Sequence, residues 1–451
     1  MTPDDVAGCV KPSSAPVSKR TIDPTLVVRR RAAGERTGID CDVCIVGSGA
    51  AGSSAAIEAG RRGRRVVLVD GAPAIGGQAT GAIIDTFCGF YSNGPKPRLL
   101  TRGIAEEIVD ALAASDSSAR IEGRRNTIIL YYRHTALQRW LEDELVKAGV
   151  TLLTGALLQC VSREQRLIRA LSVITRHGEV EIRASSFIDA SGDAALAWLA
   201  ELAVQEPAGE TIYGSQNGIV QGVDTQALED AGGPEAIKRR LVAHADRYGL
   251  ERKDAFIYVL PGTDQALVNM THIASPLDPL GAAQMVVEGH RQLDRAFDFL
   301  QREFPAVFGA ARIATYGQPG VRQTRWIKGD YQLTVDDVRS GRRFDDAVAR
   351  CAWGIELHND LADVHWEGFG DDHVHYVPYR SMIHAEADNL LAAGRCIDAD
   401  LLALSSVRVM GPCIAMGVAA AHAVDLAGSS SLRDVPIAAL RARLAQNLGA
   451  D

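Results

Sequence analysis

A glycine-rich run between two apolar stretches is the part of this sequence best suited to bind a nucleotide. Residues 43–46 are apolar, GSGAAG follows at 47–52, and a second apolar stretch at 66–69 ends on Asp70. The first glycine would make a tight turn, the second would admit a pyrophosphate, and the third would let a helix pack on the strand. The phosphates would meet N–H groups at the helix start, and Asp70 would accept from ribose hydroxyls and repel a 2′-phosphate. The pattern predicts a dinucleotide site that disfavours NADP.

Three later segments carry the same kind of chemistry. Residues 71–81, GAPAIGGQATG, contain four glycines that would bring bare backbone close to a ligand. Residues 187–193, FIDASGD, read as a strand end followed by a turn of small residues. Residues 388–396, DNLLAAGRC, read as a buried strand that ends on Gly394 and Arg395. Each segment alone could be an ordinary turn, but their order along the chain matches one architecture.

In that order, these segments resemble FAD-dependent oxidoreductases with a glutathione-reductase-type FAD domain, distantly similar to fumarate reductase and succinate dehydrogenase flavoproteins. Ser191 stands where the family usually has Thr, which keeps the hydroxyl. The resemblance implies FAD as cofactor, with Gly394 and Arg395 at its ribityl and phosphate groups. A helix beginning near Gly411 and Pro412 would face the flavin, where its N–H groups would stabilise negative charge. The cofactor-binding residues predicted in this way are Gly47, Ser48, Gly49, Ala51, Gly52, Asp70, Gly71, Gly76, Gly77, Gln78, Thr80, Leu158, Ala190, Ser191, Gly192, Gly394, Arg395, Gly411 and Pro412.

Four residues are candidates for catalysis. The segment RQTRWIKGDY at 322–331 resembles a family segment, although Gln323 and Trp326 replace its usual Glu and Arg. Arg322 and Arg325 would clamp a substrate carboxylate through paired N–H donors, and a structural salt-bridge pair is the alternative. His358 or His272 would handle the substrate proton, and a buried core histidine is the alternative.

His373 and His375 alternate along a predicted strand and would share one face. A metal pair is conceivable there, but no Cys or acid stands nearby at ligand spacing, so no metal site is predicted.

These residues lead us to expect an FAD-dependent oxidoreductase, a dehydrogenase or oxidase that moves a hydride from a small carboxylate, alcohol or amine to the flavin. Two alternatives stay open. One is an FAD-dependent monooxygenase that uses NAD(P)H and oxygen, and the other is a flavin-binding protein without turnover.

From the helices and strands expected around these residues we predict an α/β fold. It would consist of a Rossmann-like FAD/NAD(P)-binding domain, with a parallel sheet and a β-meander, plus an inserted α+β substrate domain. A helix is expected from Thr135, capped by Thr135 and Gln138 and ending at Gly149. Another apolar helical face runs from Met285 to Leu300. The expected organisation is a flexible arm at 1–39, FAD-binding segments at 40–203 and 386–428, a substrate domain at 204–385 and a tail helix at 429–451.

Composition limits the partners. The net charge of −8 offers no basic surface for nucleic acid or anionic lipid. No run of 18 apolar residues predicts a membrane span. The scattered cysteines, including the pair at 41 and 44, fit buried structural roles in a reduced cytoplasm. We expect a cytoplasmic protein with a small-molecule substrate, and a homo-oligomer stays open.

Overall fold

Strand β1 (Arg36–Val46) brings the chain into its central sheet. The computed structural model describes residues 35–115, 120–124, 126–260 and 262–449, so most of the predicted N-terminal arm lies outside the described residues. The predicted boundary at residue 39 is wrong, because β1 begins at Arg36. Arg36 pairs with Glu179 in the sheet register, and its Nε lies 3.0 Å from a carboxylate oxygen of that residue.

The central sheet has the predicted parallel core. Its strand order is β6-β2-β1-β9-β8-β7, and β21 also pairs with β9. β1, β2, β6, β9 and β21 run parallel, whereas β7, β8 and β9 form the antiparallel meander. Residues 43–46 of β1 are almost fully buried, as expected for a strand covered on both faces. The further strands of this sheet are β2 (Val66–Asp70), β6 (Thr151–Thr154), β7 (Leu157–Glu164), β8 (Leu167–Thr175), β9 (Gly178–Asp189) and β21 (Leu390–Ala392).

Strand β9 changes partner along its length. Its first half, from Gly178 to Arg183, pairs with β8 on the edge away from β1. Its last residues, Phe187 to Asp189, pair with β21 on that edge. The return segment of the chain therefore joins the sheet where β1 and β9 both end, which is the edge at which ligands of such sheets bind.

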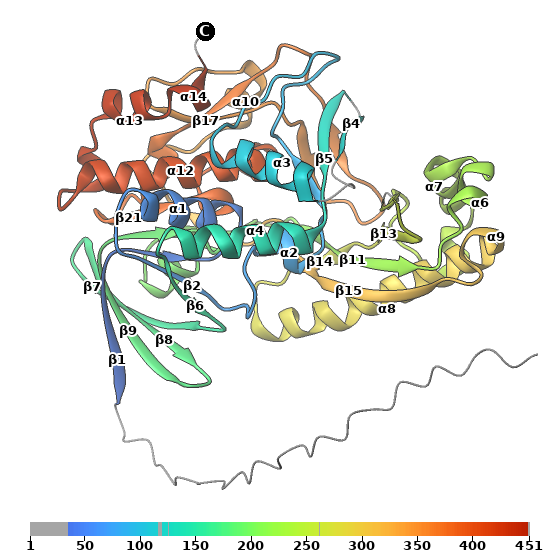
Figure 1. Cartoon of the computed structure of the whole chain (residues 1–451), viewed down its shortest axis with the longest axis horizontal. Coiled ribbons are helices and arrows are strands. Elements are labelled where there is room, and N and C mark those ends of the chain that lie inside the picture. Colours follow the sequence, from blue (N-terminus) through green and yellow to red (C-terminus); the bar gives the residue numbers. More distant parts are fainter. Residues whose placement is uncertain (1–34, 116–119, 125, 261, 450–451) are drawn as a thin grey trace, which may run out of the picture. The chain divides into compact units, whose positions relative to one another are not determined.

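Helices cover the parallel strands. Helix α1 (Ala50–Arg61) follows the glycine run and packs against α12 (Met410–Ala427), and the two lie side by side in Figure 1. Among the described residues, α12 alone is long and apolar enough to cross a membrane, and 83% of its apolar window is buried inside the protein. Its composition is that of a core helix. The other helices near this sheet are α2 (Gln78–Gly81), α3 (Ile104–Ser115), α4 (His134–Lys147), α5 (Ala195–Leu199), α11 (Leu401–Val407), α13 (Ile437–Arg443) and α14 (Ala445–Leu448).

The apolar face predicted for α4 is confirmed, but its predicted cap is wrong. Leu137, Leu141 and Leu145 are buried. The helix begins at His134 after Arg133, and the side chain of Arg133 does not cap it. Thr135 lies inside the helix, and the carboxylate of the distant Asp85 accepts the His134 backbone N–H at 2.8 Å.

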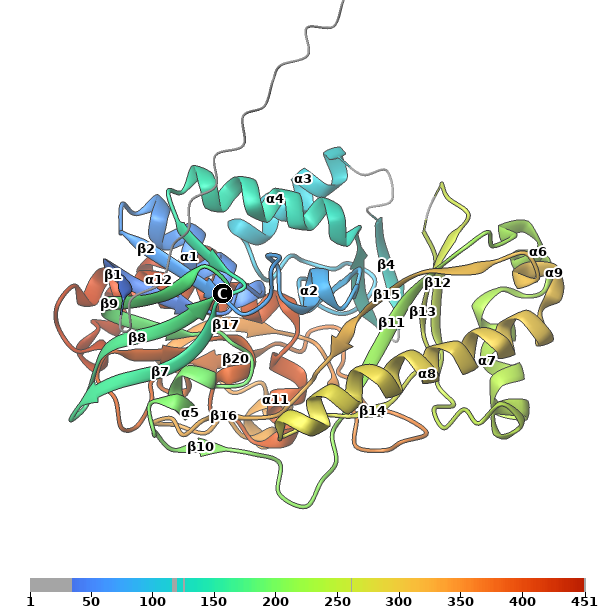
Figure 2. The same cartoon turned by 90° about the horizontal axis from the view of Figure 1, so that it is seen from below.

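A second sheet lies to one side of the molecule, seen on the right in Figures 1 and 2. β11 (Tyr213–Gln221) pairs with β13 and β14 on one edge and with β15 on the other. The long helix α8 (Pro279–Glu303) packs on β11 and β15. The other elements here are α6 (Thr225–Asp230), α7 (Gly233–His244), α9 (Pro305–Phe308), β12 (Phe256–Val259), β13 (Gln265–Asn269), β14 (Ile273–Ala274), β15 (Arg312–Gly320) and the 3₁₀ turn Ala245–Tyr248.

The predicted core face of α8 is mostly confirmed. Met285, Leu293 and Leu300 are buried, whereas Val286 is 39% exposed. Leu293 and Leu300 belong to a separate hydrophobic cluster whose buried residues all lie within 220–311.

The rest of the predicted substrate domain packs into the main hydrophobic cluster with the cofactor-side strands. The whole described chain from Arg36 forms one compact unit, so the predicted limits 204–385 do not coincide with a separate core. The elements concerned are β10 (Val204–Gln205), β16 (Trp326–Ile327), α10 (Val335–Ser340), β17 (Ala347–Cys351), β18 (Ile355–Leu357), β19 (His365–Glu367) and β20 (His375–Pro378). Three further strands, β3 (Thr86–Cys88), β4 (Arg120–Arg124) and β5 (Thr127–Tyr131), form a small antiparallel sheet, and 3₁₀ turns cover Tyr379–Ser381, Gly394–Cys396 and Leu432–Asp434.

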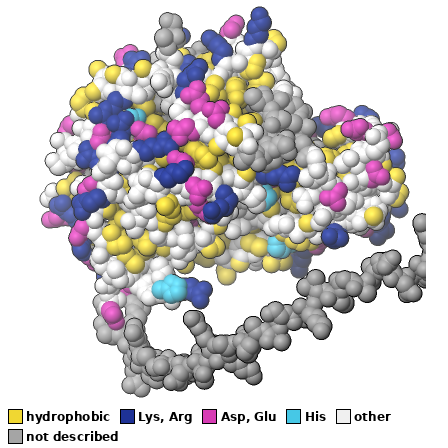
Figure 3. Space-filling model, in the orientation of Figure 1, with side chains coloured by type: hydrophobic (Ala, Val, Ile, Leu, Met, Phe, Trp, Pro, Cys, Tyr) yellow, Lys and Arg dark blue, Asp and Glu magenta, His cyan; other side chains and the backbone are white. Residues whose placement is uncertain are grey.

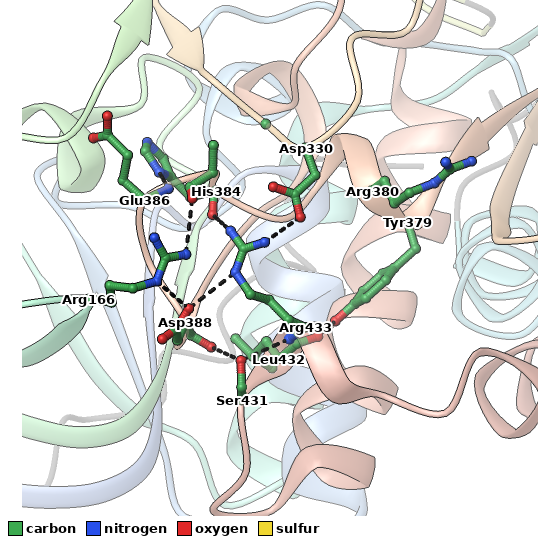
Figure 4. Close-up of polar contacts among 12 residues, drawn as sticks. Arg166, Asp330, Tyr379, Arg380, His384, Glu386, Asp388, Ser431, Leu432 and Arg433 are labelled. Carbon is green, nitrogen blue, oxygen red and sulfur yellow. Dashed lines mark hydrogen bonds and ion pairs between the residues drawn. The ribbon is translucent and has the colours of Figure 1, made fainter.

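An ionic cluster fastens the end of the chain to the return segment (Figure 4). Arg433 contacts Asp330 at 2.5 Å, Asp388 at 3.1 Å and the backbone carbonyl of His384 at 2.5 Å. Arg166, from the turn between β7 and β8, reaches the same Asp388 at 2.8 Å. This cluster ties four distant parts of the sequence together beside β21.

On the face shown in Figure 3, Lys and Arg side chains are interspersed with Asp and Glu side chains. That face carries no broad region of one charge.

Candidate active site

The glycines of the first loop have the conformations that their predicted roles require. Gly47 has a φ of +99°, which favours glycine, and an added Cβ would lie 2.3 Å from the Ala190 carbonyl oxygen. A Cβ on Gly52 would lie 1.8 Å from the Gly47 carbonyl oxygen, so α1 can approach β1 only without a side chain here. Gly49 has no atom within 4 Å of an added Cβ, and it faces open space.

Asp70 ends β2 beside this loop. One oxygen of its carboxylate accepts hydrogen bonds from the Ser48 N–H and hydroxyl, both at 2.6 Å, and the other accepts from the Ala72 N–H at 2.7 Å. The carboxylate is thereby fixed at the mouth of the loop, and the oxygen that accepts from Ala72 keeps a lone pair for a further donor.

A cavity of about 490 Å³ connects the loop with the second sheet. Eleven of the predicted cofactor residues line it, and they come from four segments of the chain. They are Gly47, Gly49, Ala51, Asp70, Gly77, Gln78, Ala190, Ser191, Gly192, Gly394 and Arg395.

The other predicted cofactor residues do not line the cavity. The Ser48 carbonyl accepts the Gly76 N–H at 3.1 Å, and the Thr80 hydroxyl donates to the Ile75 carbonyl at 2.7 Å. Leu158 lies on β7, paired with Val173 of β8, and packs against the main hydrophobic cluster. The complete set outside the lining is Ser48, Gly52, Gly71, Gly76, Thr80, Leu158, Gly411 and Pro412.

Gly411 and Pro412 stand at the start of α12, beside the cavity. A Cβ on Gly411 would lie 2.1 Å from the Gly89 carbonyl oxygen, so the start of α12 meets another backbone directly. Its neighbours Met410 and Cys413 line the cavity. The helix start thus faces the cavity through residues adjacent to the predicted pair.

Arg322, which was predicted to bind a substrate carboxylate, lines the far part of the cavity. Its guanidinium donates to the Tyr213 carbonyl at 2.6 Å and to the Ser215 hydroxyl at 2.9 Å. Within the described part of the chain it forms no ion pair. Burial, with the charges of Arg408 and Arg252 nearby, lowers the pKa of Arg322 well below its usual range. A cation in this position favours an anionic ligand.

The structure separates Arg325 from Arg322, so the predicted two-arginine clamp is not formed. Arg325 does not line the cavity. Its guanidinium lies 4.8 Å from the ring centroid of Trp198 and 3.7 Å from Glu206. The two arginines stand three residues apart in an irregular segment that bends at Thr324, so their nearness in sequence does not bring both to the cavity.

Sequence reasoning missed two arginines that line the cavity. Arg252 precedes β12 and donates to the Asn269 side chain at 2.6 Å, and Arg408 follows α11 and donates to the Glu356 carbonyl at 2.9 Å. Arg408 lies three residues before Gly411, where the start of a helix was predicted, whereas no local pattern marks Arg252. Only the tertiary fold brings them to Arg322.

The two candidate histidines are neighbours. Nε2 of His272 lies 3.0 Å from Nδ1 of His358, and both side chains are almost fully buried. His358 and Glu356 line the cavity, and His272 lies behind them. Two tryptophans, Trp353 and Trp366, also line this end of the cavity with their rings at right angles.

His373 and His375 lie outside the cavity. Their rings contact each other, with Nε2 of His373 3.2 Å from Nδ1 of His375, and His375 reaches the Ser406 hydroxyl at 3.0 Å. In the described part of the chain, no three His, Cys, Asp or Glu side chains converge on a site for a metal ion.

The model of one protein family, described as FAD dependent oxidoreductase, matches residues 42–444. The chain belongs to the FAD dependent oxidoreductase family. No curated protein is similar to it in sequence.

Several solved structures resemble this FAD dependent oxidoreductase at low sequence identity. A geranylgeranyl bacteriochlorophyll reductase-like protein from Thermoplasma acidophilum is 14% identical, with 91% of this chain and 85% of that one covered and a TM-score of 0.48. A triple mutant of the flavin-dependent brominase Bmp2 is 14% identical, with 89% of this chain and 84% of that one covered and a TM-score of 0.45. PqsL, a probable FAD-dependent monooxygenase from Pseudomonas aeruginosa, is 16% identical, over 90% and 92%, with a TM-score of 0.42.

FAD is the cofactor of this oxidoreductase, and the residues present fit it. The open space at Gly49 would take the pyrophosphate, and Asp70 is fixed where a ribose would bind. Ser191, Gly192 and Arg395 line the same cavity further along. The similarity to fumarate reductase and succinate dehydrogenase flavoproteins stays a prediction.

Proposed function

We propose that this FAD-dependent oxidoreductase is a dehydrogenase or oxidase of small organic substrates that carry a carboxylate. When bound, FAD supplies a two-electron acceptor for a hydride from a substrate carbon. The observation that carries the proposal is Arg322, a cation that contacts only neutral oxygens in the wall of the cavity that the nucleotide loop also lines. A cytoplasmic location remains part of the proposal.

The charges around Arg322 support a substrate with a carboxylate. Arg252 lies 3.6 Å from Asp254, and Asp254 also binds Lys238 at 2.9 Å. Glu356 stands beside His358 and close enough to Arg408 and Arg322 for their charges to lower its pKa. The cations of this group therefore outnumber its carboxylates, which leaves positive charge for an acidic substrate. A bidentate carboxylate would satisfy it through charge-assisted hydrogen bonds.

The walls of this part of the cavity define what else the substrate carries. Trp353, Trp366 and Phe256 line it together with the polar side chains of Asn217 and Asn269. An apolar body attached to the carboxylate would bury its surface against the rings, at about 25 cal/mol per Å² of apolar area.

The experiment uses the purified protein loaded with FAD in the absence of oxygen. Each compound of a panel of 2-hydroxy acids and amino acids is tested in one sample, and its uncharged amide is tested in a second sample. We expect the visible bands of FAD to bleach with at least one acid and much more slowly with its amide. Equal bleaching by acid and amide would refute the carboxylate, and bleaching by NADPH alone would support the monooxygenase instead.

A further inference from the structure

The backbone carbonyl of Leu361 fixes which ring nitrogen of His272 carries a proton. Nδ1 of His272 lies 2.9 Å from this oxygen. A carbonyl oxygen can only accept a hydrogen bond, so Nδ1 must carry a proton. Burial, followed by the charges of Arg252 and Arg322, lowers the pKa of His272 to about 2. The ring is therefore neutral near pH 7 and its one N–H is committed to Leu361.

The tautomer of His272 in turn fixes the tautomer of His358. With its proton on Nδ1, neutral His272 has a lone pair on Nε2, which lies 3.0 Å from Nδ1 of His358. The contact is a hydrogen bond only if His358 donates from Nδ1. The second nitrogen of His358, Nε2, is consequently unprotonated in the neutral ring.

Nε2 of His358 is placed to receive a proton. It lies 3.6 Å from a carboxylate oxygen of Glu356, on the side of the ring opposite His272. The other Glu356 oxygen accepts the Trp353 indole N–H at 3.1 Å. A protonated His358 would therefore have its new N–H beside a carboxylate that is held in place.

We propose that Glu356, His358 and His272 form a proton relay in which Nε2 of His358 accepts the substrate proton and His272 is the positioning residue. The proposal rests on the proposed function. As the substrate carbon gives up its hydride, the O–H or N–H bond on that carbon breaks and its proton forms a bond with Nε2. The electron pair left behind closes the C=O or C=N double bond, so the product is a keto or imino acid.

The surrounding charges couple this step to substrate binding. Burial and the charge of Arg322 hold the pKa of His358 well below its ordinary value, while Glu356 opposes them. A substrate carboxylate on Arg322 would neutralise that repulsion and make an imidazolium easier to form. Arg252 adds to the repulsion. His358 thus becomes a better base only when an acid occupies the site.

The relay is tested by nuclear magnetic resonance on the FAD-loaded protein with ¹⁵N-labelled histidine. The ring signals of His358 are identified by their loss in a His358→Asn variant. We expect the wild-type protein at pH 7 to show the Nδ1–H tautomer. The Nε2–H tautomer, or a charged ring, would overturn the proposal.

Two variants at position 272 test whether His272 sets the tautomer of His358 or only supports the fold. In His272→Gln, one amide supplies both a donor for Leu361 and an acceptor for His358, so the tautomer should persist. In His272→Leu both are lost, and we expect a mixture of tautomers. With a substrate identified, kcat should fall at least tenfold in His272→Leu with KM nearly unchanged, and His272→Gln should recover most of it.

An unchanged tautomer in a folded His272→Leu would refute the role of His272. The FAD content is read from the same samples by visible absorbance. A protein that binds no FAD would end the proposed function, whereas the tautomer would still be measurable, so the two failures are distinguishable.

Discussion

Ser48 holds Asp70 through two hydrogen bonds to the same carboxylate oxygen, one from its backbone N–H and one from its hydroxyl, both 2.6 Å long. The loop that would receive the pyrophosphate and the acid that would receive the ribose are thereby one rigid unit. Because the carboxylate is oriented before the cofactor arrives, little conformational entropy is lost when it binds.

We expect Asp70→Ala to weaken FAD binding about tenfold or more. The change removes hydrogen bonds to a charged group, each worth about 1.5–3 kcal/mol, and leaves the Ser48 donors without their acceptor. Fluorescence titration of the apoprotein with FAD measures the effect. Asp42→Ala is the matched control, since Asp42 is a carboxylate on β1 that pairs with Arg65 away from the cavity. Equal losses in both variants would contradict the ribose assignment.

Two glycines in the same loop should respond differently to alanine. Gly52→Ala places a Cβ 1.8 Å from the Gly47 carbonyl oxygen, so the protein should lose stability or fail to fold. Gly49→Ala meets no protein atom within 4 Å, so the fold should persist while the methyl group fills space needed by the pyrophosphate. Thermal unfolding measures the stability of each variant, and the FAD content measures its cofactor binding. A Gly49→Ala protein with full FAD content would show that the phosphates bind elsewhere.

The cofactor side of this protein was predictable from sequence because its determinants are local. Gly47, Gly49 and Asp70 belong to one βαβ unit, where turn geometry and strand length fix how far apart they lie. The parallel sheet, the meander and the return strand follow from apolar runs bounded by turns. The boundaries were less predictable, as β1 shows by starting at Arg36, because the pairing partner that extends it is far away in sequence.

The substrate side was only partly predictable, for the opposite reason. Arg252, Arg322 and Arg408 converge on one cavity from three separate segments, and no spacing along the chain encodes that meeting. Nearness in sequence even misled the interpretation, since Arg325 lies three residues from Arg322 and packs on Trp198 instead.

Arg322→Gln should raise the KM of the acid substrate about 100-fold or more. Removing one partner of a buried ion pair costs about 3–5 kcal/mol. Arg325→Gln is the control, since it makes the same chemical change three residues away but outside the cavity. Steady-state kinetics on both variants measure the difference. A rise in KM of similar size in Arg325→Gln would mean that the effect is structural.

Arg433→Ala should lower the melting temperature by a few degrees. The change leaves Asp330 and Asp388 without a partly buried cation that bridges them, at a cost of about 1–3 kcal/mol (Figure 4). Arg169→Ala removes an exposed ion pair with Glu164 and should change the melting temperature little. Calorimetry on both variants separates them, and equal shifts would show that the cluster contributes no more than a surface pair.

Acid should destabilise this protein from about pH 6.5 downward, in part through His375. Burial, followed by the charge of His373, lowers the pKa of His375 to about 3 from an ordinary value of 6.5. The unfolded chain therefore binds a proton between these values that the folded chain does not, and protonation favours unfolding. The contribution of the neutral ring is complete above pH 6.5 and falls by about 1.4 kcal/mol for each pH unit below it.

Urea unfolding at pH 7.5 and at pH 5 measures this slope. At pH 5 His375 alone should account for about 2 kcal/mol of lost stability. His375→Gln keeps a polar side chain that does not titrate, so the difference between the two pH values should shrink by that amount even if the variant is less stable at both. His177→Gln, at an exposed position, should leave the difference unchanged. If His375→Gln kept the full wild-type slope, the acid sensitivity would belong to other groups and His375 would have to titrate near its ordinary value.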